Sequence, residues 1–165
     1  MTQNASPAAA KQTATPAVVH STFEIERVYP TTAAKAFHAF SDMATKRRWF
    51  VEGEGWTIDD YQMDFRTGGR EFSAFRFGDG PAMTNETLYH DIIPNERMIF
   101  TYKMTVGDAI LSVSLATITL KPDAKGTLMT YVEQGAYMGG NPDEAKMRHE
   151  GCAELFEALA KELAR

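Results

Sequence analysis

Cysteine and long apolar runs are scarce in this sequence. Cys152 is the only cysteine in 165 residues, so no disulfide can form within the chain. No apolar run approaches the length of about 20 residues that a helix needs to cross a membrane. The first residues also lack the basic and apolar regions of a secretory signal. We therefore expect a soluble cytoplasmic protein that does not contact membranes.

Basic charge is in short supply as well. Lysine and arginine total 17 against 22 aspartate and glutamate residues, for a formal net charge of −5. Nucleic-acid binding relies on a basic surface that displaces counterions from phosphates, so this balance argues against a DNA or RNA partner. The hydrophobic fraction of 44% is ordinary and, at this length, predicts one domain with a substantial core.

The first twenty residues are mainly Ala, Thr, Gln and Pro, and Lys11 is their only charged side chain. A segment of this composition buries too little apolar surface to fold by itself. We expect a disordered tail over residues 1–20 and a single domain over residues 21–165.

The pattern beyond the tail predicts one strand, two short helices and six further strands. The first strand begins near Thr22 and ends at Pro30. Thr31 or Thr32 is suited to cap one short helix, and Ser41-Asp42 is suited to cap a second. Turn residues then separate alternating segments at residues 56–65, 70–77, 83–93, 97–105, 109–120 and 127–134.

The last segment, residues 141–165, predicts a long amphipathic helix. Asn141 is a suitable N-cap and Pro142 a suitable first residue. One apolar stripe at helical spacing consists of Cys152, Leu155, Phe156, Leu159, Ala160 and Leu163. The side chains expected to face water are Glu154, Glu157, Lys161, Glu162 and Arg165. A helix with one apolar face needs a sheet to lie on, and the seven preceding strands supply one.

Alternation assigns faces on two of the strands. Residues that share one side of the strand at 97–105, which we expect to face inward, are Met98, Phe100, Tyr102 and Met104. On the strand at 127–134, Met129, Tyr131 and Glu133 share a side. If that side faces the helix, the Glu133 carboxylate lies at the edge of the interior.

This order of elements, together with several short motifs, resembles a known family. The motifs are Arg27 with Pro30, Arg-Trp-Phe at 48–50, Phe-Arg-Thr-Gly-Gly-Arg at 65–70, Ile-Pro-Asn-Glu-Arg-Met at 93–98, Ser-Val-Ser-Leu-Ala-Thr at 112–117, Gly-Thr-Leu at 126–128, Glu-Gln-Gly at 133–135, and Gly151. From Thr22 to the C-terminus the chain resembles the branch related to the C-terminal domain of activators of the Hsp90 ATPase. That branch lies within the SRPBCC superfamily, which includes START domains and polyketide cyclases.

The resemblance implies an α+β helix-grip (Bet v 1-like) fold, β-α-α-β6-α, in which a curved, antiparallel, seven-stranded sheet wraps around the C-terminal helix. It also implies a cavity between sheet and helix that often holds an apolar molecule. Members include lipid carriers, polyketide cyclases and aromatases, and cochaperone modules, so the fold alone does not assign an activity. Where the family usually has a bulky aromatic after the helix glycine, this chain has Gly151-Cys152, which should enlarge the cavity.

Our leading hypothesis is a binding protein for a small apolar molecule, without a catalytic site or cofactor. The residues expected to bind the ligand are Trp49, Phe100, Tyr102, Met104, Met129, Tyr131, Glu133, Arg148, His149, Cys152 and Phe156. Methionine and aromatic side chains adapt well to ligands, although the same set also makes an ordinary core. One alternative is an interaction module for an Hsp90-type chaperone, and another is a cyclase-like or aromatase-like enzyme. We expect a monomer or a homodimer.

Other chemistries find weaker support. His149 and Cys152 lie one helical turn apart, but neither a second cysteine nor a zinc-protease histidine accompanies them, so we expect no metal site. A cysteine within a helix on an apolar stripe is not activated as a nucleophile. Acid–base catalysis could use Glu133, Tyr102, Tyr131, Arg148 or His149, although each is more simply a polar group that orients a ligand or satisfies the core. The glycines at 67–70 fit a tight turn better than a phosphate loop.

Overall fold

The protein folds into one antiparallel sheet and three helices, as shown by a computed structural model that describes residue 15 and residues 17–165. The elements in chain order are β1 (Val19–Tyr29), α1 (Ala33–Ser41), α2 (Met43–Phe50), β2 (Trp56–Met63), β3 (Arg70–Phe77), β4 (Met83–Ile93), β5 (Arg97–Val106), β6 (Ala109–Asp123), β7 (Gly126–Tyr137) and α3 (Glu144–Leu163). This order confirms the predicted α+β helix-grip class.

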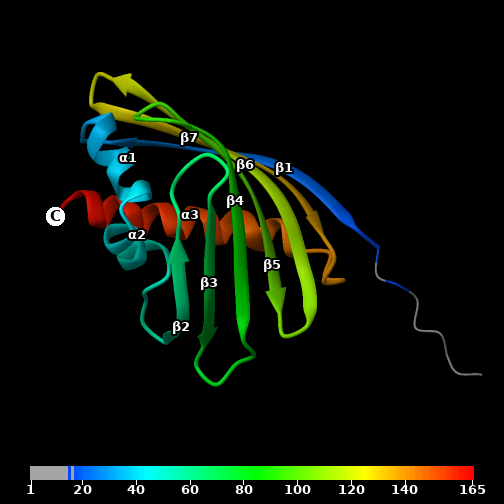
Figure 1. Ribbon diagram of the computed structural model, residues 1–165. Coiled ribbons are helices and arrows are strands. Elements are labelled where there is room, and N and C mark those ends of the chain that lie inside the picture. The colour runs from blue at the N-terminus through cyan, green and yellow to red at the C-terminus, as the bar shows by residue number, and fades with distance from the viewer. Residues whose placement is uncertain (1–14, 16) are drawn as a thin grey trace, which may run out of the picture.

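The seven strands form a single sheet in the order β1-β7-β6-β5-β4-β3-β2. Every neighbouring pair is antiparallel. Short turns connect the consecutive strands β2 to β7, and the last strand, β7, also pairs with the whole length of β1. The sheet curves around α3, which crosses its concave side, while α1 and α2 cover one end (Figure 1). Within the described residues, no helix is both long enough and apolar enough to span a membrane.

Local capping explains where the two short helices begin. The Thr32 side chain accepts a hydrogen bond of 3.2 Å from the Lys35 N–H, and the Asp42 carboxylate accepts one of 2.8 Å from the Thr45 N–H. Each bond satisfies a backbone donor that the first turn leaves free. Both caps confirm the prediction from the sequence.

The start of α3 differs from the prediction. Asn141 is not the N-cap, because its side chain accepts a hydrogen bond of 2.9 Å from the Asp143 N–H and so forms a local turn before the helix. Asp143 occupies the N-cap position instead, and the first helical residue is Glu144 rather than Pro142. The Glu144 side chain reaches back to the Gly139 N–H at 3.2 Å, which ties the turn to the helix.

The first strand starts earlier than the sequence suggests. Val19 and His20, which composition assigns to the tail, already belong to β1 and pair with Tyr137 and Ala136 of β7. Composition misses them because the pairing partner lies more than a hundred residues away. The rest of the expected tail lies largely outside the described residues.

The core lies where α3 packs on the strands β1, β7 and β6. Its buried residues on the helix are Cys152, Phe156, Leu159, Glu162 and Leu163. The expectation that Glu162 faces water is therefore wrong. Its carboxylate is buried between α2 and α3, where Arg48 donates a hydrogen bond of 3.1 Å from Nε. A carboxylate tolerates burial when such a partner compensates its charge.

Candidate functional site

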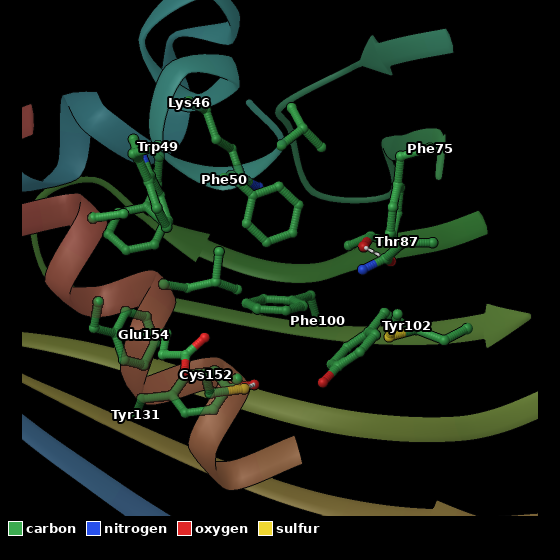
Figure 2. Close-up of a pocket in the computed structure, with 18 of the residues that line it drawn as sticks. Lys46, Trp49, Phe50, Phe75, Thr87, Phe100, Tyr102, Tyr131, Cys152 and Glu154 are labelled. Atoms are coloured by element: carbon green, nitrogen blue, oxygen red, sulfur yellow. Dashed lines mark hydrogen bonds between the residues drawn. The ribbon is translucent and has the colours of Figure 1, made fainter. Parts of the chain in front are cut away.

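A cavity of about 430 Å³ lies between the concave side of the sheet and the helices α2 and α3. Figure 2 shows Lys46, Trp49 and Phe50 of α2 on one side of it, with Phe100 and Tyr102 of the sheet below and Cys152 of α3 opposite. Its wall is predominantly aromatic and aliphatic. The aromatic and methionine members are Phe40, Trp49, Phe50, Trp56, Phe65, Phe75, Met83, Tyr89, Met98, Phe100, Tyr102, Met104, Tyr131, Met147 and Phe156.

A row of aromatic rings on β4 and β5 makes the floor of the cavity. The ring centroids of Tyr89 and Phe100 lie 6.1 Å apart, and those of Phe100 and Tyr102 lie 6.2 Å apart. Tyr89 and Phe100 are paired across the two strands, and Tyr102 follows Phe100 on the same face. The period of two predicted for β5 therefore turns Met98, Phe100, Tyr102 and Met104 into the cavity.

One face of α3 forms the opposite wall. Met147, Gly151, Leu155 and Ala158 recur at intervals of three or four residues, so they share this face. Gly151 belongs to the cavity wall, and a side-chain carbon there would meet no atom within 4 Å outside its own stretch of helix, so open space lies beside the helix backbone at this position. The small residues Gly151 and Cys152 thus leave space between helix and sheet, in line with the expectation from the sequence.

A buried polar network closes one end of the cavity around Glu133 of β7, whose side chain is fully buried. Its carboxylate accepts hydrogen bonds from Tyr102 at 2.7 Å, Tyr131 at 2.6 Å and Ser114 at 2.7 Å. Arg148 of α3 adds an ion pair at 3.1 Å. The charge is thus compensated by one guanidinium and several hydroxyl groups, which makes its burial tolerable.

Arg148 is itself held by several partners from the sheet. Its Nη1 donates to the Tyr102 hydroxyl at 2.7 Å, and its Nη2 donates to the Ser112 hydroxyl at 2.7 Å. The guanidinium carbon also lies 5.3 Å from the centre of the Tyr102 ring, at cation–π distance. These contacts fix the guanidinium in place, so Arg148 presents a rigid and already paired charge at the cavity wall.

Burial sets the protonation of the hydroxyl and thiol groups here. The pKa values of Tyr102 and Tyr131 lie well above their ordinary value because burial disfavours the charged phenolate. Burial likewise raises the pKa of the Cys152 thiol to about 12. Burial acts to lower the pKa of Arg148, but the neighbouring Tyr102 and Glu133 oxygens outweigh it and raise that pKa. At neutral pH the two phenols and the thiol therefore keep their protons.

A second buried network, which sequence reasoning missed, lies around Glu71 of β3. Lys46 of α2 forms an ion pair with its carboxylate at 2.6 Å, and Tyr61 donates to it at 3.1 Å. Tyr89 donates to the same carboxylate and accepts a hydrogen bond of 3.2 Å from Lys46. Lys46 and Tyr89 belong to the cavity wall, whereas Glu71 lies behind it. The helical spacing of Lys46, Trp49 and Phe50 could have indicated that Lys46 shares the face of α2 that carries these two rings.

The structure places eight of the eleven predicted ligand-binding residues in the cavity wall, namely Trp49, Phe100, Tyr102, Met104, Tyr131, Arg148, Cys152 and Phe156. Met129 is instead fully buried in the core, and Glu133 lies behind the wall residues that it binds. His149 packs edge-on against Phe23 with 5.1 Å between ring centroids. One step along a helix turns a side chain by about 100°, which carries His149 away from the cavity that Arg148 faces.

Four of the five residues weighed for acid–base chemistry, Glu133, Tyr102, Tyr131 and Arg148, meet in the network around Glu133, and His149 lies outside it. Across residue 15 and residues 17–165, no three His, Cys, Asp or Glu side chains cluster closely enough to hold a metal ion. The Cys152 sulfur lies 3.7 Å from the Glu133 carboxylate and is buried. Residues 67–69 lie in the turn between β2 and β3, which ends at Arg70, the first residue of β3, and Gly68 there adopts a φ of 80° that favours glycine.

The exposed residues of the cavity wall lie on α3 and on the segment from the end of α2 to the start of β2, which places the mouth of the cavity between them. Trp56 and Met147 belong to the wall and are also exposed. Trp56 stacks edge-on against Phe75 and Phe77, with centroid distances of 5.6 Å and 5.1 Å. The charged residues at this rim are Glu52 and Glu154, both exposed. The rim therefore combines an aromatic edge with negative charge.

Comparison with known proteins gives a family match. A family model described as Activator of Hsp90 ATPase homolog 1-like protein matches residues 30–164. A crystal structure of the Mll3558 protein from Rhizobium loti is 46% identical, with a TM-score of 0.81 over 88% of this chain and 99% of that one. A structure of a putative uncharacterized protein from Rhizobium leguminosarum is 34% identical, with a TM-score of 0.85 over 90% and 97% of the two chains.

A more distant structure shares the fold alone. DynU16, a putative protein in the dynemicin biosynthetic locus, is 19% identical with a TM-score of 0.64, and the match covers 87% of this chain and 47% of DynU16. A search of curated proteins returned no match.

Proposed function

The chain belongs to the family of Activator of Hsp90 ATPase homolog 1-like proteins, and on that premise we propose that it binds a small apolar molecule between its sheet and α3. The observation that carries the proposal is the aromatic and methionine-lined cavity of about 430 Å³. This volume falls within the range of about 300–1,000 Å³ that is usual for small-molecule sites. The wall would bury most of the ligand and contact it mainly through rings and thioethers.

Gly151 adds an energetic argument. A glycine within a helix costs about 1 kcal/mol relative to alanine, and nothing near Gly151 forbids a side chain. Glycine at this position therefore makes the helix less stable, and the benefit that the structure shows is room in the cavity. Such a cost in helix stability is expected where the room serves a ligand.

A fluorescence titration with N-phenyl-1-naphthylamine, an apolar probe, tests this proposal. We expect saturable binding at one site in the wild-type protein. Gly151→Leu places a side chain in the cavity and should weaken binding at least about tenfold, a loss of about 1.4 kcal/mol. Gly151→Ala is the matched control, because its single methyl group leaves most of the space, and it should bind within about twofold of wild type. Equal affinity of the Leu variant would overturn the site.

Chemistry on the bound molecule is a second candidate, favoured by Tyr102 and Arg148 in the wall. The Tyr102 proton is donated to Glu133, however, and burial keeps the hydroxyl protonated, which suits orientation of a ligand better than proton transfer. If a turnover is found, Tyr102→Phe and Glu133→Gln should abolish it. Unchanged turnover in both variants would remove these residues from the mechanism.

The description of the matching family also suggests a role with an Hsp90-type chaperone. An ATPase assay of the host's Hsp90 homologue, with and without this protein, distinguishes that role from ligand binding. Stimulation that survives Gly151→Leu would assign the activity to a surface of the protein rather than to the cavity. Absence of both stimulation and co-purification would rule the chaperone role out.

A further inference from the structure

We propose that the ligand of this cavity is an uncharged molecule, and that carboxylates, sulfonates and phosphates are excluded from it. This inference rests on the proposed function and specifies the chemical class of its ligand. It follows from how the charged side chains around the cavity are paired. The charged wall residues are Lys46, Glu52, Arg148 and Glu154.

Both cations in the wall are already neutralised by carboxylates behind it. Lys46 pairs with Glu71 at 2.6 Å, and Arg148 pairs with Glu133 at 3.1 Å. The side chains of Lys46 and Arg148 are 9% and 14% exposed, so water does not separate the pairs. Each pair carries no net charge. The cation of each pair attracts an anion in the cavity, but the carboxylate behind that cation repels the anion. The two effects largely cancel.

The hydroxyl groups that could solvate an anion are also engaged. Tyr102 and Tyr131 donate their protons to Glu133, and Tyr89 donates its proton to Glu71. To accept a hydrogen bond from one of these hydroxyl groups, an ionised ligand would have to displace the carboxylate of Glu133 or Glu71. Moving an uncompensated charge out of water into such a site costs several kcal/mol.

One acidic group at the mouth acts in the same direction. Glu154 is exposed beside the opening, whereas the charge of Glu52, also exposed there, is offset by its ion pair with Arg47 at 2.8 Å. The negative charge of Glu154 disfavours an approaching anion. The polar wall groups outside the two ion-pair networks, Asn85 and Thr87, are uncharged, and Thr87 donates to Asn85 at 3.2 Å. They can form hydrogen bonds with a neutral carbonyl or hydroxyl group.

Two probes with one skeleton test the inference. N-phenyl-1-naphthylamine is neutral, and 8-anilinonaphthalene-1-sulfonate adds one sulfonate to the same rings. We expect the dissociation constant of the sulfonate probe to be at least about tenfold higher than that of the neutral probe. The buffer contains enough salt to screen the net charge of the chain. Equal or tighter binding of the sulfonate in competition with the neutral probe would overturn the inference. Failure of both probes to bind would overturn the proposed function instead.

Glutamine substitutions sharpen this test. Glu71→Gln and Glu133→Gln each leave one wall cation without its carboxylate, which should favour the sulfonate probe. The dissociation constant of the sulfonate probe divided by that of the neutral probe should therefore fall about tenfold. The two sites are separate, so either variant suffices if the other does not fold. Glu157→Gln is the control, because this substitution changes the net charge equally. The wild-type Glu157 pairs with Arg27, and both residues lie outside the wall. An unchanged ratio in a folded Glu71 or Glu133 variant would contradict the inference.

Discussion

Arg148 of α3 and Glu133 of β7 form an ion pair of 3.1 Å in the interior, where Glu133 is fully buried. This pair joins the helix to strand β7, next to the edge strand β1, and fixes one end of the cavity. It also holds the hydroxyl of Tyr102 through both partners. The shape of the cavity and its electrostatic neutrality therefore depend on the same few residues.

The first prediction concerns the stability that this pair provides. Glu133→Ala leaves Arg148 buried without its counter-charge, and we expect the free energy of unfolding to fall by about 3–5 kcal/mol. Urea denaturation followed by circular dichroism measures the change. Glu157→Ala removes the exposed pair with Arg27 and should cost less than about 1 kcal/mol. Similar losses in the two variants would show that burial of the pair does not matter.

The second prediction separates stability from binding at Gly151. Both Gly151→Ala and Gly151→Leu should raise the free energy of unfolding by about 0.5–1 kcal/mol, because both residues favour the helix and meet open space. Thermal unfolding in the absence of ligand checks this. A Leu variant that is less stable than wild type would mean that the space beside the helix is already filled.

The third prediction concerns the thiol of Cys152. Its pKa of about 12, raised by burial from 9.0, lowers the share of reactive thiolate at pH 8 about 1000-fold. The native protein should therefore react with Ellman's reagent far more slowly than the urea-unfolded protein. The chain has a single cysteine, so the absorbance reports this site alone. Rates within tenfold of each other would show that the thiol is accessible in the native state.

The fourth prediction concerns pH and Glu162. Hydrogen bonds from Arg48 hold the pKa of this carboxyl below its ordinary value. A lowered pKa in the folded state stabilises the protein above pH about 4.5, and this contribution disappears as the pH falls through the folded pKa. Glu162→Gln should therefore be less stable than wild type at pH 7, and the two curves should converge in acid. A gap that does not narrow as the pH falls below about 4.5 would refute the electrostatic explanation.

Much of the fold was predictable because its signals are local. Caps such as Thr32 and Asp42, and the alternation along β5, depend on neighbours within a few residues. The inward-facing set of β5 follows from that alternation alone. The start of β1 was missed because Val19 is ordered only by its pairing with Tyr137.

The polar networks were less predictable because they join distant segments. Glu71 lies on the inward face of β3, and its partner Lys46 precedes it by 25 residues on a different element. Glu162 was expected in water, since no pattern around it reveals that Arg48 of α2 packs against it. Periodicity assigns a residue to a face, but it does not say which charge from another element will meet it there.

The most direct test of the account is a crystal structure of the protein soaked with N-phenyl-1-naphthylamine. We expect electron density for the two ring systems between Trp49, Phe100 and Cys152, with both buried ion pairs intact. Density on the exposed outer face near Val113 and Leu115, with the cavity left empty, would contradict it.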